Sequence, residues 1–158
     1  MRVGITGHSN LTVDAEPIVA DALEKVLAEI GGPIVGVTCL ARGADQIGAR
    51  VVLELGGDVE VILPAADYRE RKVKPDNREA FETLLGLALA VRVLPFDMSN
   101  RAAYMAASEA LLGDVEHLVA VWDGNPSDGH GGTGDVVAAA RELGVPVTVV
   151  WPIGATRA

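Results

Sequence analysis

The fold of this chain is organised around a glycine-rich run that separates an apolar segment from an amphipathic one. The run reads Gly124-Asn-Pro-Ser-Asp-Gly-His-Gly-Gly-Thr-Gly-Asp135, and five of its twelve residues are glycine. Residues 117–121 before it have the apolar pattern of a buried strand, and residues 136–143 after it repeat apolar side chains at helical spacing. A glycine-rich turn between a strand and a helix directs several backbone N–H groups at one point, where a phosphate can bind. A mobile surface turn is the alternative interpretation.

The same alternation of strand and helix patterns extends over the whole chain. Apolar, β-branched segments occur at residues 2–6, 34–38, 59–63, 91–94, 117–121 and 145–151, with helical periodicity between them. Short strands that are apolar on both faces are typical of parallel sheets covered by helices on both sides. The sequence therefore predicts an α/β fold, a single Rossmann-like domain over residues 1–153 with an open parallel sheet. We expect the short tail at 154–158 to fray.

Length and composition restrict the function classes. A chain of 158 residues with 49% hydrophobic residues is large enough to bury a core. A formal charge of −9 and an aromatic content of 4% argue against a broad nucleic-acid surface, because such surfaces neutralise phosphates and stack bases. Cys39 is the single cysteine, which excludes an internal disulfide and a zinc cluster built from thiolates. Without a secretory pattern or a membrane-length apolar run, we expect a soluble, cytoplasmic protein with no membrane partner.

Polar residues follow the first strand, at the sheet edge where ligands of open parallel sheets bind. Gly7 permits a close backbone approach there, and His8, Ser9 and Asn10 offer hydrogen-bonding side chains. The Gly-x-Gly-x-x-Gly pattern is missing, which weakens a dinucleotide interpretation. Capping of the next helix by Ser9, Asn10 or Thr12 is the alternative role for this loop.

The loop after the second strand carries Arg42, Gly43 and Asp45. Gly43 opens a helix, and Arg42 at its start is placed to meet an anion beside the free N–H groups. Asp45 in the first turn suits the helix dipole, and an Arg42–Asp45 ion pair is the alternative interpretation. After the third strand, five of the thirteen basic residues fall within positions 69–78. This segment can form a basic rim around the ligand, or it can be a solvated loop.

The glycine-rich loop supplies the remaining binding residues. Asp123 and Gly124 lie at the end of the fifth strand. The Asp123 carboxylate there can accept ribose hydroxyls, act as an acid or base, or cap the turn. His130 has no second histidine at ligand spacing, so we expect no metal site. The N–H groups and the hydroxyl that hold phosphate are expected at Gly131, Gly132, Thr133 and Gly134.

Three motifs in this order resemble the SLOG superfamily: Gly-His-Ser-Asn at 7–10, Ala-Arg-Gly-Ala-Asp at 41–45 and Gly-Gly-Thr-Gly-Asp at 131–135. Members of this superfamily are Rossmann-like proteins related to the LOG phosphoribohydrolases and to the DNA-processing protein DprA. The resemblance covers nearly the whole chain. It implies a nucleotide, or a ligand derived from one, over the ends of the strands.

The resemblance leaves binding and hydrolysis open. LOG enzymes carry Pro-Gly-Gly-x-Gly-Thr-x-x-Glu, and aligning Gly132-Thr133 with its Gly-Thr puts Val136 at the position of the glutamate. Asp135, one residue earlier, is then the candidate catalytic residue. We favour a nucleotide-binding domain with no certain cofactor beyond that nucleotide, over a phosphoribohydrolase that releases a base from a nucleoside monophosphate. A nucleotide-sensing interaction module, with a possible homo-oligomer, is the third hypothesis.

Overall fold

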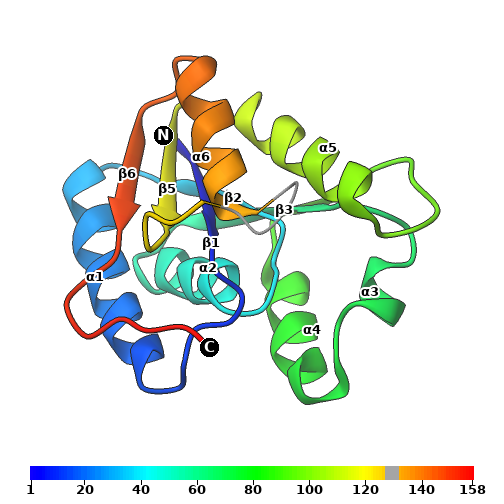
Figure 1. Ribbon diagram of the computed structural model, residues 1–158, viewed down its shortest axis with the longest axis horizontal. Helices are drawn as coiled ribbons and strands as arrows, with labels where there is room; N and C mark the ends of the chain where they lie inside the picture. Colours follow the sequence, from blue (N-terminus) through cyan, green and yellow to red (C-terminus); the bar gives the residue numbers. More distant parts are fainter. Residues whose placement is uncertain (127–131) are drawn as a thin grey trace.

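The structure is a computed structural model that describes residues 1–126 and 132–158. Within these residues, six strands form one parallel sheet. They lie in the order β4-β3-β2-β1-β5-β6 (Figure 1). The strands are β1 (Arg2–Gly7), β2 (Val35–Thr38), β3 (Asp58–Leu63), β4 (Ala90–Val93), β5 (His117–Val121) and β6 (Val147–Val150). The expected α/β fold with a parallel Rossmann-like sheet is confirmed, and each expected strand is present to within two residues at its N-terminal end.

Helices cover both faces of the sheet, as parallel strands require because every connection must cross over. They are α1 (Ala15–Ile30), α2 (Ala44–Glu54), α3 (Tyr68–Arg71), the 3₁₀ turn η1 (Pro75–Asn77), α4 (Arg78–Leu87), α5 (Arg101–Leu112) and α6 (Thr133–Glu142). One face carries α1, α2 and α4, and the other carries α5 and α6 (Figure 1). Among the described residues, no helix combines the length and apolar character needed to cross a membrane.

The hydrophobic core is divided by the sheet into two clusters. On the first face, Val19, Leu23 and Leu27 of α1 are fully buried, and their four-residue spacing puts them on one side of that helix. On the second face, Leu111 of α5 and Val136 of α6 pack against the strands. Burial of both faces explains the continuous apolar runs of the central strands.

Strand β4 departs from the expectation that every strand is covered. All its residues, Ala90–Val93, are exposed, and Leu87 and Leu89 just before it are exposed as well. The reason is position, because β4 is an edge strand and pairs only with β3. The expected homo-oligomer stays a prediction.

The tail at 154–158 pairs with the loop after β1. The Ala158 N–H donates to the Asn10 carbonyl at 2.9 Å, and Leu11 and Arg157 form an antiparallel bridge. The expectation that this tail frays is wrong, because its backbone is bonded to residues of the first loop. The domain boundary placed before the tail stays a prediction.

Strand order reverses between β1 and β5, and Gly7 ends β1 at this point. A Cβ built on Gly7 would lie 2.6 Å from the Cβ atoms of Ala44 and Val121. Distances this short are repulsive, so a side chain at position 7 would push α2 away from the sheet. The close approach of β1, β5 and α2 therefore requires glycine here.

We predict that Gly7→Ala lowers the free energy of unfolding by about 1–3 kcal/mol, the usual range for overpacking. Gly86→Ala is the matched control, since nothing lies within 4 Å of a Cβ at that exposed position in α4. The control should leave stability unchanged or raise it slightly, because alanine favours helix. Urea unfolding of both variants measures the difference, and equal stability of the two would contradict the account.

Candidate functional site

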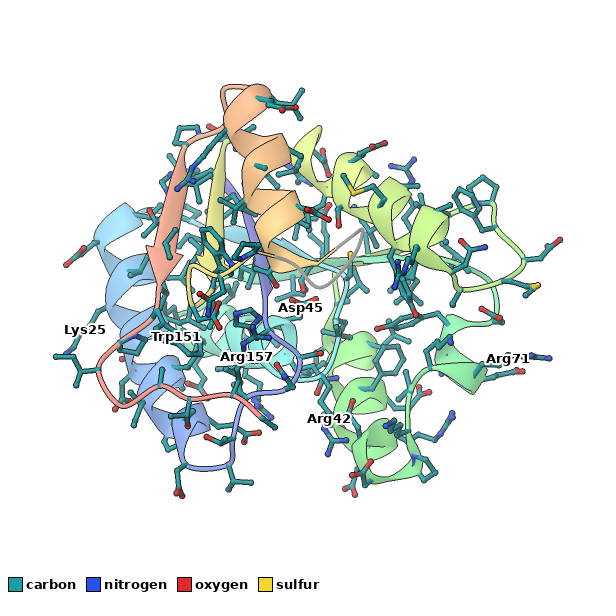
Figure 2. The ribbon with its side chains drawn as sticks, in the orientation of Figure 1. Lys25, Arg42, Asp45, Arg71, Trp151 and Arg157 are labelled. Atoms are coloured by element: carbon teal, nitrogen blue, oxygen red, sulfur yellow. The ribbon has the colours of Figure 1, made fainter. Side chains whose placement is uncertain are left out.

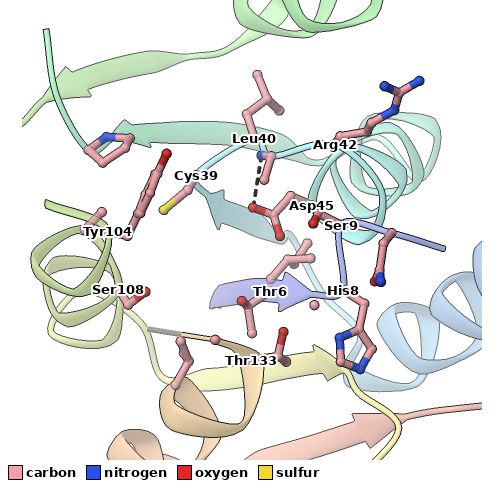
Figure 3. A pocket seen from close by; sticks show the side chains of 18 of the residues that line it. Thr6, His8, Ser9, Cys39, Leu40, Arg42, Asp45, Tyr104, Ser108 and Thr133 are labelled. Carbon is pink, nitrogen blue, oxygen red and sulfur yellow. Dashed lines mark hydrogen bonds between the residues drawn. The ribbon is translucent and has the colours of Figure 1, made fainter. Parts of the chain in front are cut away.

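A cavity of about 730 Å³ opens at the carboxyl ends of the central strands (Figure 3). Its walls come from the loops after β1 and β2, the segment between β3 and α4, helix α5, the residues after β5, the first turn of α6 and the C-terminal segment. We call it the switch-point cavity, because it lies where strand order reverses, the usual ligand position in such sheets.

The switch-point cavity brings together most of the expected ligand-binding residues. Those that line it are Gly7, His8, Ser9, Asn10, Arg42, Asp45, Gly132, Thr133 and Gly134. Those outside its described lining are Gly43, Asp123, Gly124 and Asp135, while Gly131 lies outside the described residues. The three loops predicted from sequence therefore meet at one cavity, whereas the candidate catalytic Asp135 follows Thr133 and Gly134 on α6 without joining the described wall.

Backbone contact between the first two loops sets the shape of this edge. The Ala44 N–H donates to the His8 carbonyl at 3.2 Å. Gly43 has a positive φ of 87°, and a Cβ there would lie 2.6 Å from the His8 carbonyl oxygen. One N–H group at the start of α2, expected to be free for an anion, is thus already bonded to the protein.

Asp45 is a buried acid in the cavity wall, only 6% exposed. Its Oδ2 accepts a hydrogen bond from the Ala41 N–H at 3.1 Å. Burial raises the pKa of Asp45 to about 7, although hydrogen bonds from the Ala41 N–H and the Thr38 hydroxyl oppose the rise. The alternative Arg42–Asp45 ion pair is not formed, because Arg42 is turned outward and bonds Asp76 instead (Figure 3).

Leu40 holds the loop after β2 in an unusual conformation, with a positive φ of 59°. Its N–H donates to the Thr38 hydroxyl at 3.1 Å, and its carbonyl accepts from the Gln46 side-chain amide at 3.2 Å. Gln46 also exchanges two hydrogen bonds with the amide of Asn77 in η1. A residue other than glycine keeps a left-handed backbone conformation only where surrounding bonds hold it there. Here those bonds join the loop to residues 69–78, which we call the basic segment.

His8 and Asp123 form a largely buried pair at the other side of the cavity. The His8 Nε2 accepts a hydrogen bond from the Asp123 N–H at 3.1 Å, and the Asp123 Oδ1 lies 3.3 Å from the same nitrogen. Burial and the nearby Arg157 lower the pKa of His8, so the ring is neutral at pH 7. Asp123 thus contacts His8 from outside the described cavity lining and positions its ring.

Arg157 is a cavity residue that sequence reasoning missed. Its Nε donates to the Asp123 Oδ2 at 2.7 Å, and its side chain reaches the cavity from the C-terminal segment (Figure 2). Burial disfavours ionisation of Asp123, but hydrogen bonds from the Asn125 N–H and Arg157 outweigh it and lower its pKa to about 2. Only the pairing of the tail with residues 10–12 brings Arg157 here, and no local pattern in the sequence indicates that pairing.

The charge of the cavity differs in sign from that of the chain. Among its described lining residues, Asp45 is the one acidic side chain, against the basic Arg42, Lys72, Lys74 and Arg157. Lys72 and Lys74 come from the basic segment that the sequence offered as a rim or a solvated loop. The described residues contain no group of three His, Cys, Asp or Glu side chains that could hold a metal ion.

Aromatic side chains form the wall opposite His8. Tyr68 and Tyr104 both line the cavity and pack edge to face with their ring centroids 6.3 Å apart. Ser108, one turn further along α5, and Thr133 add hydroxyl groups below them (Figure 3). One end of the cavity is therefore aromatic, and its rim is basic.

Comparison with known proteins agrees with this architecture. No protein-family model and no curated protein matches the chain. Among solved structures, DprA from Helicobacter pylori superposes with a TM-score of 0.69 at 16% identity, over 99% of this chain and 68% of that one. DprA from Streptococcus pneumoniae gives 0.68 at 16% identity, over 97% of this chain and about half, 51%, of that one. TM1055, a structural genomics target, gives 0.58 at 21% identity, over 92% and 71%. At these identities the likeness shows a shared fold.

The expectation that charge excludes a broad nucleic-acid surface is wrong. The Helicobacter pylori DprA structure is described for its single-stranded DNA binding mode, and it has the fold of this chain. The error lies in using the net charge of −9, a sum over the whole molecule, to exclude binding by one local surface. The switch-point cavity is basic despite that sum.

We predict a pH-dependent stability difference between the wild type and Asp45→Asn. In the folded protein Asp45 keeps its proton up to a pKa of about 7, whereas an unfolded aspartate ionises near pH 4. The folded state therefore binds more protons between these values, and its stability falls as pH rises. Relative to the variant, the wild type should lose up to about 1.4 kcal/mol per pH unit from about pH 4 to 7, then level off. Denaturant unfolding at several pH values measures this, and a constant difference would contradict the buried acid.

Proposed function

We propose that this domain binds a nucleotide in the switch-point cavity, with its phosphate at the basic rim and its base toward the tyrosines. The observation that carries the proposal is the meeting of three loops and four basic side chains at one cavity of an otherwise acidic chain. Its volume of about 730 Å³ falls in the range typical of small-molecule sites.

The phosphate end is supported by the start of α6. Thr133 and Gly134 are the first residues of this ten-residue helix, so their N–H groups have no partner within it. The helix dipole favours an anion there, and the Thr133 hydroxyl lines the same wall. Lys72 and Lys74 on the facing segment add charge that a phosphate would neutralise.

The ring end is supported by Tyr104, which is partly exposed on the cavity wall, and by Tyr68 behind it. A base stacks favourably on such an aromatic face. Asp45, with a pKa of about 7, can accept a hydrogen bond when ionised and donate one when protonated. This combination of an aromatic wall and a buried carboxyl suits a heterocycle with N–H groups.

Single-stranded DNA is a second candidate ligand. Support comes from the fold shared with DprA of Helicobacter pylori, which is described as a single-stranded DNA binder, and from the basic rim of the cavity. A strand would place one nucleotide in the cavity and the next phosphates along the segment that holds Lys72 and Lys74.

The phosphoribohydrolase and the sensing module stay predictions. Cleavage of an N-glycosidic bond needs an acid near the sugar, and Asp45 is the acid that lines the described wall. Membership of the SLOG superfamily is part of the same proposal: its motifs at 7–10 and 41–45 contribute residues to the cavity.

We predict that AMP, or a single-stranded oligonucleotide if DNA is the ligand, raises the melting temperature of the protein. Arg42→Gln should weaken binding about tenfold, because a charge-assisted hydrogen bond to phosphate is lost. Arg69→Gln is the matched control, since Arg69 pairs with Glu82 outside the cavity lining. The control should bind as the wild type does.

Thermal shift followed by titration calorimetry measures both effects. The two candidate ligands are separated by competition, in which AMP displaces a labelled oligonucleotide only if they share the cavity. A lack of stabilisation by any nucleoside mono-, di- or cyclic phosphate and by the oligonucleotide, at millimolar concentration, would overturn the proposal.

A further inference from the structure

The guanidinium of Arg42 is already paired with the carboxylate of Asp76. Its Nη1 donates to the Asp76 Oδ1 at 3.1 Å, and its Nη2 donates to the Asp76 Oδ2 at 2.9 Å. Two parallel N–H···O bonds of this kind are also the geometry in which arginine binds two oxygens of a phosphate. The carboxylate of Asp76 thus already uses the two N–H groups through which Arg42 could bind a phosphate.

Asp76 is an acidic residue inside the basic segment. Its position in η1 is set independently of Arg42, by the double hydrogen bond between Gln46 and its neighbour Asn77. The hydrogen bonds from Arg42 and the charge of Lys74 lower the pKa of Asp76, so it is ionised at neutral pH. The Asp76 side chain is 67% exposed, so a ligand can reach its carboxylate.

We propose that Asp76 is an internal competitor for the guanidinium of Arg42, which a ligand phosphate must displace in order to bind. This inference rests on the proposed nucleotide site and adds a residue that sets its affinity. Both partners are largely exposed, with side-chain exposures of 49% and 67%. Exposed ion pairs contribute little to stability, so a ligand phosphate can replace the Asp76 carboxylate with little loss of folding free energy.

The competition lowers the affinity of every anion that uses Arg42 by the same factor. A nucleotide adds contacts with the aromatic wall and keeps useful affinity. Asp76 therefore lowers the affinity of ligands that use Arg42 relative to ligands that do not, such as adenosine, and leaves the ratio of affinities among phosphate-bearing ligands unchanged.

The test is a double-mutant cycle with AMP as the probe, measured by titration calorimetry. Asp76→Asn removes the charge and keeps the shape, and it should tighten AMP binding about two- to fivefold, the size expected for an exposed pair. In the Arg42→Gln background the same change should have no effect. Adenosine, which lacks the phosphate, should bind both single variants as it binds the wild type.

Glu82→Gln is the matched control, because Glu82 forms the same two-bond pair with Arg69 outside the cavity lining. It should leave AMP binding unchanged. A gain from Asp76→Asn that persists without Arg42 would reveal a general charge effect and overturn the inference. Unchanged or weaker binding by Asp76→Asn would also overturn it, since Asp76 would then be neutral or needed to orient Arg42. Nucleotide binding by the wild type would still support the proposed function in these cases, whereas its absence would remove both.

Discussion

The site depends on one close backbone approach, between the loop after β1 and the start of α2. The Ala44 N–H bonds the His8 carbonyl at 3.2 Å, and Gly7 and Gly43 leave room for that contact. A side chain at either glycine would meet atoms at 2.6 Å. The contact fixes the distance between the first two loops, and with it the positions of His8 on one side of the cavity and Asp45 on the other.

The charge of the cavity lining is opposite in sign to the net charge of the molecule. The chain carries a formal charge of −9, yet four of the five charged side chains in the described cavity lining are basic. Two of these are already held by carboxylates, Arg42 by Asp76 and Arg157 by Asp123. The Arg42–Asp76 pair is exchangeable, whereas the less exposed Arg157–Asp123 pair, with side-chain exposures of 29% and 11%, holds the tail in place. The two arginines thus have different roles, one available to a ligand and one that anchors the tail.

The sheet and its ligand edge could be predicted from the sequence because both follow from local patterns. Apolar runs mark the strands, and polar residues such as His8 and Arg42 follow directly after them. Long-range pairings could not be predicted. The bond between Arg157 and Asp123 depends on a tail that the sequence pattern assigns no structure, and the pair of Arg42 with Asp76 depends on η1, which has no periodicity. The exposure of β4 likewise follows from its place at the edge of the sheet, and the apolar pattern of a segment does not indicate where in the sheet its strand lies.

The central claim, a nucleotide site at the switch point, is tested most directly by an amide NMR titration with AMP. The account predicts that the signals of Gly7, His8, Arg42 and Thr133 shift together and saturate with one dissociation constant. Signals of the exposed edge strand Ala90–Val93, at the far side of β3, should stay in place. Shifts confined to that edge, or none at millimolar AMP and none with a single-stranded oligonucleotide, would contradict it.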